Sequence, residues 1–389
     1  MNTMNTLPFT YFDVLKKRHP ELFEYVNKEI FILRQKGSIT PLTSTEKLQY
    51  CDEYIKTVIS YFKNYIKSNS ARMGIGFVTD NEIINLFQNS EDFKKLIYDT
   101  EINYLTTTNF ELFDKKTFYI SDNLVEHLAY TEIDTISEYV CPPFDCCLFV
   151  YTSPIAIKAF YKIQEKQEDI DLNSPISVFI VNMPSEQGER IIVFACWHAN
   201  QWRTYSYVKR QLLIRKDWTI KQMLKTDWKD IYQENLEFSE FAVDEERVFY
   251  EDGLLFFRIV VNSIIYLSSN EPDIINCLSP RTAIKEEIKR YPYAKRKILK
   301  KEANSVTELD FASVGSTLGK IIVQKPQPPS DSSFSSSERR QLSARFIVRG
   351  HWRNQPHGEG NKQRKLIWIK PYYKGPDMAD LINKPYDIR

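Results

Sequence analysis

Apolar residues in the N-terminal part of the chain recur with the spacing of helices. Apolar side chains lie three or four residues apart through residues 12–33 and again through residues 54–65, which places them on one face of a helix. Thr43 or Ser44 can cap the second helix, because Glu46 follows Thr43 by three residues as in a capping box. A further helical stretch is expected over residues 80–99.

Beta character is expected from about residue 117 onward. Short runs rich in β-branched and aromatic residues follow, each bounded by turn residues, at 146–152, 177–182, 190–197 and 202–208. Because several of these runs are apolar throughout, both faces of the resulting sheet are expected to be covered. Hairpin-sized connections between the later runs favour a mostly antiparallel sheet.

The pattern becomes helical again at residues 244–269. Its most apolar part, residues 253–267, is 15 residues long and contains Arg258 and Asn262, so it is too short and too polar to span a bilayer and is predicted to be a buried core helix. Pro272 prevents its continuation. The basic segment that follows, residues 281–301, contains Tyr291-Pro292-Tyr293 and is therefore not expected to form one uninterrupted helix.

The fold class predicted from these patterns is α+β, with four parts. Residues 1–115 form a helical N-terminal region and residues 116–323 an α+β body. Residues 324–341 are rich in Pro and Ser and are predicted to be a linker. Residues 342–389 are predicted to be a small basic β-rich module, with strands at 345–353 and 365–370 joined by a turn over 355–361.

Charge is distributed unevenly along the chain, although the net charge is +1. Residues 281–301 carry nine Lys and Arg against two Glu, and residues 338–374 carry ten against two, whereas the first 280 residues have a net charge of −11. Such segregation indicates a polyanionic partner for the C-terminal third, with nucleic acid as the first candidate. The alternative is that the basic end docks on the acidic body of the same chain.

The C-terminal hairpin supplies the candidate RNA-binding residues. Cations neutralise phosphates and aromatic rings stack on unpaired bases, so basic and aromatic side chains on one small module suit RNA. The candidates are Arg345, Arg349, Arg353, Lys362, Arg364, Lys365, Trp352 and Trp368.

Several classes of protein lack support in the sequence. No Walker loop, dinucleotide fingerprint, HExxH or GxSxG motif is present. The six cysteines fit no zinc spacing and include no CxxC pair. No secretory signal is visible at the N-terminus. We therefore expect a reduced, cytoplasmic protein with no metal, no small-molecule cofactor and no membrane partner.

Several short segments of the chain resemble the type V-A anti-CRISPR protein number two family. They are Phe144–Val150, Leu267 with Glu271–Ile274, Val314–Gly319, Val348–Trp352, Gly358–Gly360, Lys365, Trp368 and Pro371. They occur in the family's order over roughly residues 144–375, and the Arg-Gly-His-Trp segment is the most specific. The N-terminal 140 residues carry no part of the resemblance.

The resemblance implies a function linked to translation. For the characterised member it implies recognition of the N-terminal part of a target's nascent polypeptide, followed by loss of the message being translated. The implied partners are therefore a nascent polypeptide or another protein target, together with RNA or the ribosome. Different N-terminal regions would select different targets.

A ribonuclease is an alternative reading of the same hairpin. A His beside Arg and Lys can act as general acid or base on a ribose 2′-hydroxyl, while cations stabilise the transition state. The candidate catalytic residues are His351, His357 and Arg353. In the competing reading these residues anchor the hairpin or only bind phosphates, and the protein is a non-catalytic scaffold or inhibitor.

Two further clusters attract attention. Trp197, His198 and Trp202 could line a peptide groove, or they could pack the edge of a sheet. Glu271 and Asp273 flank Pro272, and the expectation is a helix stop whose acids face the basic segment, because no third ligand stands at metal spacing.

Overall fold

The computed structural model describes most of the chain after residue 101 and part of the N-terminal region. The described residues, apart from single positions within them and two isolated residues elsewhere, are 7–35, 102–163, 170–184, 190–199, 204–224, 243–324 and 346–374. The helices predicted at 54–65 and 80–99, Trp202, Arg345 and all of the predicted linker except Gln324 lie outside them.

Two helices at the N-terminus confirm the first helical prediction. They are α1 (Tyr11–Arg18) and α2 (Pro20–Gln35). Thr10 precedes α1, and its backbone N–H donates to the Asp13 carboxylate over 2.9 Å, as in a capping box. Pro20 suits the first position of α2, where its missing N–H costs nothing. Residues 105–112 are also helical.

A seven-stranded sheet forms the centre of the molecule, in the order β5-β4-β3-β2-β1-β7-β6. Its strands are β1 (Thr117–Ile120), β2 (Cys146–Tyr151), β3 (Ile176–Pro184), β4 (Arg190–Ala199), β5 (Thr204–Ile214), β6 (Ile274–Cys277) and β7 (Phe311–Val314). The prediction of a mostly antiparallel sheet is confirmed. β1 nevertheless pairs in parallel with both β2 and β7, and β6 and β7 had not been predicted.

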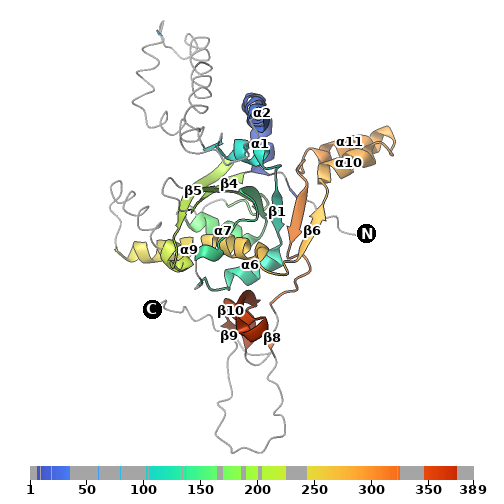
Figure 1. Ribbon diagram of the computed structural model, residues 1–389. Coiled ribbons are helices and arrows are strands. Elements are labelled where there is room, and N and C mark those ends of the chain that lie inside the picture. The colour runs from blue at the N-terminus through green and yellow to red at the C-terminus, as the bar shows by residue number, and fades with distance from the viewer. Residues whose placement is uncertain are drawn as a thin grey trace, which may run out of the picture.

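Both faces of the sheet are covered, as predicted. In β2, Cys147, Phe149 and Tyr151 belong to one core and Cys146, Leu148 and Val150 to the other, which follows the period of two in a strand. Helices α6 (Asp122–Ala129), α7 (Pro154–Lys162) and α9 (Val243–Leu267) cover the first face. Helices α1 and α2, with residues 102–112, cover the second (Figure 1).

Helix α9 confirms the predicted core helix, because its side chains from Phe256 to Leu267 are largely buried against the sheet. Its polar member Asn262 is fully buried, so it needs hydrogen-bond partners within the protein. Among the described residues, no helix combines the length and the apolar character needed to cross a bilayer.

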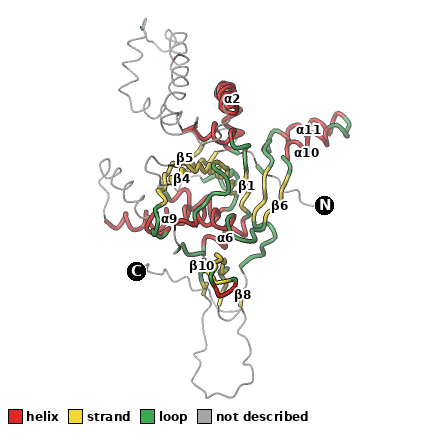
Figure 2. The backbone as a smooth tube through the Cα atoms, viewed as in Figure 1, coloured by secondary structure: helices red, strands yellow, loops and turns green. Residues whose placement is uncertain are grey.

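The basic segment forms two helices, which agrees with the expectation that it is not one uninterrupted helix. They are α10 (Pro280–Ile288) and α11 (Tyr293–Ala303), with Pro292 at the N-cap of α11. Figure 2 shows them as a helical pair that projects from the end of the sheet next to β6.

The C-terminal module contains the predicted hairpin, with corrected strand limits. Strands β9 (Phe346–Val348) and β12 (Tyr372–Lys374) pair at its base, with β8 (Val323–Gln324) beside β12; β10 (His351–His357) and β11 (Gln363–Ile369) pair toward the tip. The single first strand predicted over 345–353 is wrong: pairing breaks at Gly350, and β10 runs on into the predicted turn. Pairing also resumes after Pro371 instead of ending there, although Pro371 has no N–H to offer the ladder.

Candidate nucleic-acid interface

Two tryptophans hold the C-terminal hairpin on the body. Trp352 on β10 is opposite Trp368 on β11, and their rings stack with centroids 6.0 Å apart. The indole N–H of Trp352 donates to Oδ1 of Asn262 over 2.8 Å, and that of Trp368 donates to Oγ1 of Thr131 over 3.1 Å. We call Trp352, Trp368, Asn262 and Thr131 the tryptophan anchor.

The tryptophan anchor corrects the expectation that both indoles stack on bases. Trp352 is 8% exposed, and Trp368 packs edge-on against Tyr266 and His127. Asn262 completes its hydrogen bonding by donating to the carbonyl oxygens of Leu128 and Thr131. Both rings pack against side chains of the protein. An unpaired base therefore finds no free face of Trp352 on which to stack.

Gly350 lets the hairpin approach the body closely. Its N–H donates to the Tyr130 carbonyl over 3.0 Å, and its own carbonyl accepts from the N–H of Glu132 over 2.8 Å. A Cβ at this position would lie 2.8 Å from the carbonyl oxygen of Ile369, from Cδ of Pro371 and from Oγ1 of Thr131. The close contact therefore explains why this position in the Arg-Gly-His-Trp segment is a glycine.

The outer face of the hairpin presents the basic candidates. Side chains directly opposite in an antiparallel pair share a face, so His351, Arg353 and His357 on β10 face outward with Lys365 on β11. Arg353 is opposite Ile367, which makes Lys365 its diagonal neighbour at about 7–8 Å. Arg353 is exposed and Lys365 half-buried, and neither forms an ion pair with a described residue.

The remaining candidate cations lie elsewhere on the module. Lys362 is in the exposed turn and Arg364 is exposed near the tip, opposite Pro356. Arg349 lies at the base, where its guanidinium is 3.9 Å from the Glu132 carboxylate. Arg349 therefore has an intramolecular role that Arg353 lacks.

The ribonuclease candidates are not brought together. His351 and His357 stand at the two ends of β10, and His351 is opposite Ile369 at the end away from the turn. Six residues of a strand span about 20 Å, too far for the two imidazoles to act on one phosphodiester. Both histidines are exposed, and neither imidazole hydrogen-bonds to a described residue.

The candidate peptide residues of β4 are internal. Trp197 is 3% exposed and its ring stacks on Tyr11 with centroids 4.4 Å apart. His198 is fully buried; its Nε2 donates to the Ser174 carbonyl, so its Nδ1 accepts from the Tyr161 hydroxyl. Burial lowers the pKa of His198. These contacts correspond to the packing alternative and leave no groove between Trp197 and His198.

Asp273 has a partner other than the one expected. Its carboxylate accepts from the backbone N–H and the hydroxyl of Thr317, both over 2.7 Å, and so faces the loop 315–319 and not the basic segment. Gly315 in this loop has φ +72°, and a Cβ there would lie 2.6 Å from Cβ of Leu124. Two separate segments of the family resemblance thus meet at the start of α6.

The same loop leads back to the tryptophan anchor through His127. Nε2 of His127 donates to the Gly319 carbonyl over 3.1 Å, while Nδ1 has no hydrogen-bond partner among the residues that the structure describes. Burial lowers the pKa of His127, and Lys370 lowers it further. Burial therefore favours the neutral form of the imidazole that packs against Trp368.

The described residues contain no group of three or more His, Cys, Asp or Glu that could hold a metal ion. Sequence reasoning missed Asn262 and Thr131 as the partners of the indoles. A usable signal was present, because a lone Asn in an apolar core helix must find hydrogen-bond partners.

Comparison with known proteins gave one match. The model of the AcrVA2-like family, described as anti-CRISPR type V subtype A2, matches residues 118–373, about two thirds of the chain. Comparisons with curated proteins and with solved structures gave no match.

Proposed function

The chain belongs to the anti-CRISPR type V subtype A2 family, and from this we propose that it recognises a nascent polypeptide and promotes loss of the mRNA being translated. In this proposal the C-terminal hairpin contacts RNA or the ribosome. The protein acts by binding and needs no catalytic group of its own.

The proposed RNA contact is supported by one observation: the two faces of the hairpin have different surroundings. The inner face is occupied by Trp352 and Trp368, which dock on the body. The outer face presents Arg353 and Lys365 as diagonal neighbours. Intramolecular docking and RNA binding are therefore compatible, because each uses a different face.

The module also has the charge that such a contact requires. Residues 346–374 carry seven Lys and Arg against one Glu. Phosphate contacts of this kind supply affinity without sequence specificity. Selection of one message would then come from the nascent polypeptide, and the hairpin would hold the protein close to the RNA while that polypeptide is read.

Polysome sedimentation of the tagged full-length chain tests the proposal. We expect the protein to sediment with polysomes of cells that translate its target and to be released by puromycin. The double variant Arg353→Glu/Lys365→Glu should reduce this association, and Lys158→Glu/Lys216→Glu, which makes the same charge change at exposed positions outside the hairpin, should not.

Two outcomes would contradict the proposal. Absence of the wild-type protein from polysomes would remove the link to translation. Association that survives puromycin but not ribonuclease would mean that RNA is bound without a nascent chain. RNA cleavage in EDTA by the wild type and not by His351→Ala would instead support the ribonuclease alternative.

A further inference from the structure

The helical pair α10–α11, residues 280–303, is a second strongly basic surface of this chain, and we call it the basic arm. It lies outside the C-terminal hairpin and projects from the end of the sheet beside β6 (Figures 1 and 2). We propose that the basic arm is an RNA-binding element, which grips phosphates through one face of α11 and stacks Tyr293 on an unpaired base. The inference does not depend on the nascent-chain proposal.

The exposed face of α11 carries a stripe of cations that begins with an aromatic ring. Leu299 and Ala303 are buried and define the inner face of the helix. Tyr293, Lys297 and Lys301 follow one another at intervals of four, on the opposite side, with Lys300 beside them. The stripe extends for about 12 Å along the helix axis.

Apolar side chains in the basic arm are left in water. Tyr293 is 86% exposed and Ile298 is 68% exposed. Tyr293 is the first residue of α11, next to the turn that joins the two helices, so it lies at the outer end of the arm. An aromatic ring in this position can stack on an unpaired base.

The cations of the stripe have no acidic partner among the described residues. Glu286 is bound to Lys289, and no ion pair joins Lys297, Lys300 or Lys301 to any residue that the structure describes. Like charges four residues apart on a helix repel each other. A row of unpaired lysines on one face therefore destabilises the isolated helix, and a bound polyanion would neutralise this repulsion.

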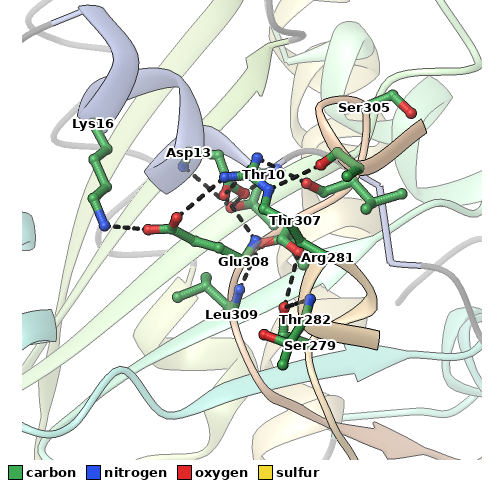
Figure 3. Close-up of polar contacts among 12 residues, drawn as sticks. Thr10, Asp13, Lys16, Ser279, Arg281, Thr282, Ser305, Thr307, Glu308 and Leu309 are labelled. Carbon is green, nitrogen blue, oxygen red and sulfur yellow. Dashed lines mark hydrogen bonds and ion pairs between the residues drawn. The ribbon is translucent and has the colours of Figure 1, made fainter. Parts of the chain in front are cut away.

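The base of the basic arm is fixed to the body, as Figure 3 shows. The Arg281 guanidinium donates to the carbonyls of Ala303 and Val306, each over 3.0 Å, and binds Glu308 over 3.1 Å. Glu308 in turn binds Lys16 of α1. The arm is therefore held in position, so that the stripe is presented at a set angle.

Asp13 completes the junction at the base of the arm. It is 3% exposed and lies 3.9 Å from Arg281, and its carboxylate accepts from the N–H of Glu308 over 3.1 Å. Burial raises the pKa of Asp13, against the lowering effect of hydrogen bonds from Thr307, Thr10 and Glu308. Asp13 therefore connects α1 to the base of the arm through its contacts with Arg281 and Glu308.

The chemistry of the arm favours RNA over the other polyanions. Lysines spaced along one helix face suit the repeating phosphates of a nucleic acid backbone. The exposed ring of Tyr293 adds a stacking platform, and unpaired bases occur mainly in the loops, bulges and ends of RNA. An acidic protein would use the lysines but would leave the ring without a partner of comparable fit.

Fluorescence anisotropy with the purified full-length chain tests the proposal. The probes are an RNA stem–loop, the DNA stem–loop of the same sequence, and a blunt RNA duplex, each titrated at two salt concentrations. We expect Lys297→Glu/Lys301→Glu to weaken stem–loop RNA binding at least tenfold and to lower the salt slope by about two. Tyr293→Ala should weaken binding to the stem–loop severalfold and leave the blunt duplex within twofold.

Matched variants keep the result interpretable. Lys158→Glu/Lys216→Glu makes the same charge change at exposed positions outside the arm and should stay within twofold of the wild type. Lys297→Gln/Lys301→Gln repeats the test without reversing charge near the end of α11, and circular dichroism checks that each variant is folded. Arg353→Glu/Lys365→Glu measures the hairpin separately, so that failure of one surface does not count against the other.

Three results would overturn the inference. The first is unchanged RNA affinity in both lysine variants of the arm. The second is equal affinity of the wild type for DNA and RNA stem–loops, which would remove the choice of RNA. The third is competition by polyglutamate as effective as that by RNA, which would identify an acidic protein as the partner.

Discussion

Trp352 and Asn262 are separated by 90 positions in the chain, and the indole N–H of one donates to the side-chain oxygen of the other over 2.8 Å. The bond joins the C-terminal hairpin to the C-terminal part of the core helix α9. Asn262 thus meets its need for partners, and the hairpin gains a fixed orientation with its cations outward.

Replacing Trp352 tests this bond directly. Trp352→Phe keeps most of the ring but leaves Oδ1 of Asn262 without its donor, which we expect to lower the free energy of unfolding by about 1–3 kcal/mol. Urea unfolding measures the loss. Trp218→Phe is the control, because Trp218 is only half-buried and its indole donates to no described residue; an equal loss in both variants would contradict the importance of the bond.

Gly350 should not tolerate a side chain. In Gly350→Ala the new methyl would lie 2.8 Å from three groups, two of them a backbone oxygen and a proline ring, so we expect a loss of about 1–3 kcal/mol. Gly319→Ala is the matched control, since a Cβ there meets nothing within 4 Å. Thermal unfolding of the two variants compares them, and equal midpoints would show that the hairpin can shift away without cost.

Acidification should destabilise the protein through two buried histidines. Burial lowers the pKa values of His127 and His198 in the folded state, so the unfolded chain binds more protons as the pH falls below about 6.5. Their contribution to stability is therefore complete above that pH and is lost as the pH drops through the folded values. Urea midpoints at pH 7.5 and 5.5 should differ less in His198→Gln than in the wild type; an equal difference would exclude His198 as a source.

Thiol reactivity should distinguish the exposed Cys141 from the cysteines that are buried in the sheet. Cys141 is exposed, whereas burial raises the pKa values of Cys146, Cys147 and Cys196, which are fully enclosed. We expect iodoacetamide to modify Cys141 in the folded protein and the three sheet cysteines only after unfolding. Peptide mass spectrometry measures each site, and early modification of Cys147 would mean that the sheet opens in the native state.

The central strands were predictable because short stretches of sequence are enough to show that they are buried. β2, β3 and β4 are runs of apolar residues bounded by turns, and period and composition suffice to find them. β6 was missed because it is an edge strand of only four residues. Its side chains Ile274 and Ile275 are 40% and 45% exposed, so the strand lacks the pattern of a buried one. The parallel pairing of β1 with β2 and β7 could not be predicted, because it joins segments that are distant in the sequence and the residue pattern within each segment does not identify its partner.

The limits at the hairpin have a chemical origin. An indole on a basic strand suits a nucleobase and a buried amide equally well, so sequence could not decide between them for Trp352. The role of Trp352 depends on its hydrogen-bond partner Asn262, which lies in a different element and cannot be identified from the sequence of the strand. Likewise the contact of Arg349 with Glu132 depends on the fold of the body, so the strand pattern alone could not predict it.

The segment that matches the family begins at residue 118, yet one of the two cores of the sheet is completed by residues that precede it. Leu7, Phe12, Val26 and Phe110 cover the face formed by Leu148, Phe179 and Val181. A chain trimmed to the family segment would present that face to water, and its exposed strands would favour self-association. The family segment of this chain is thus not a self-sufficient folding unit, because one of its two cores is closed only by apolar side chains from the residues that precede it.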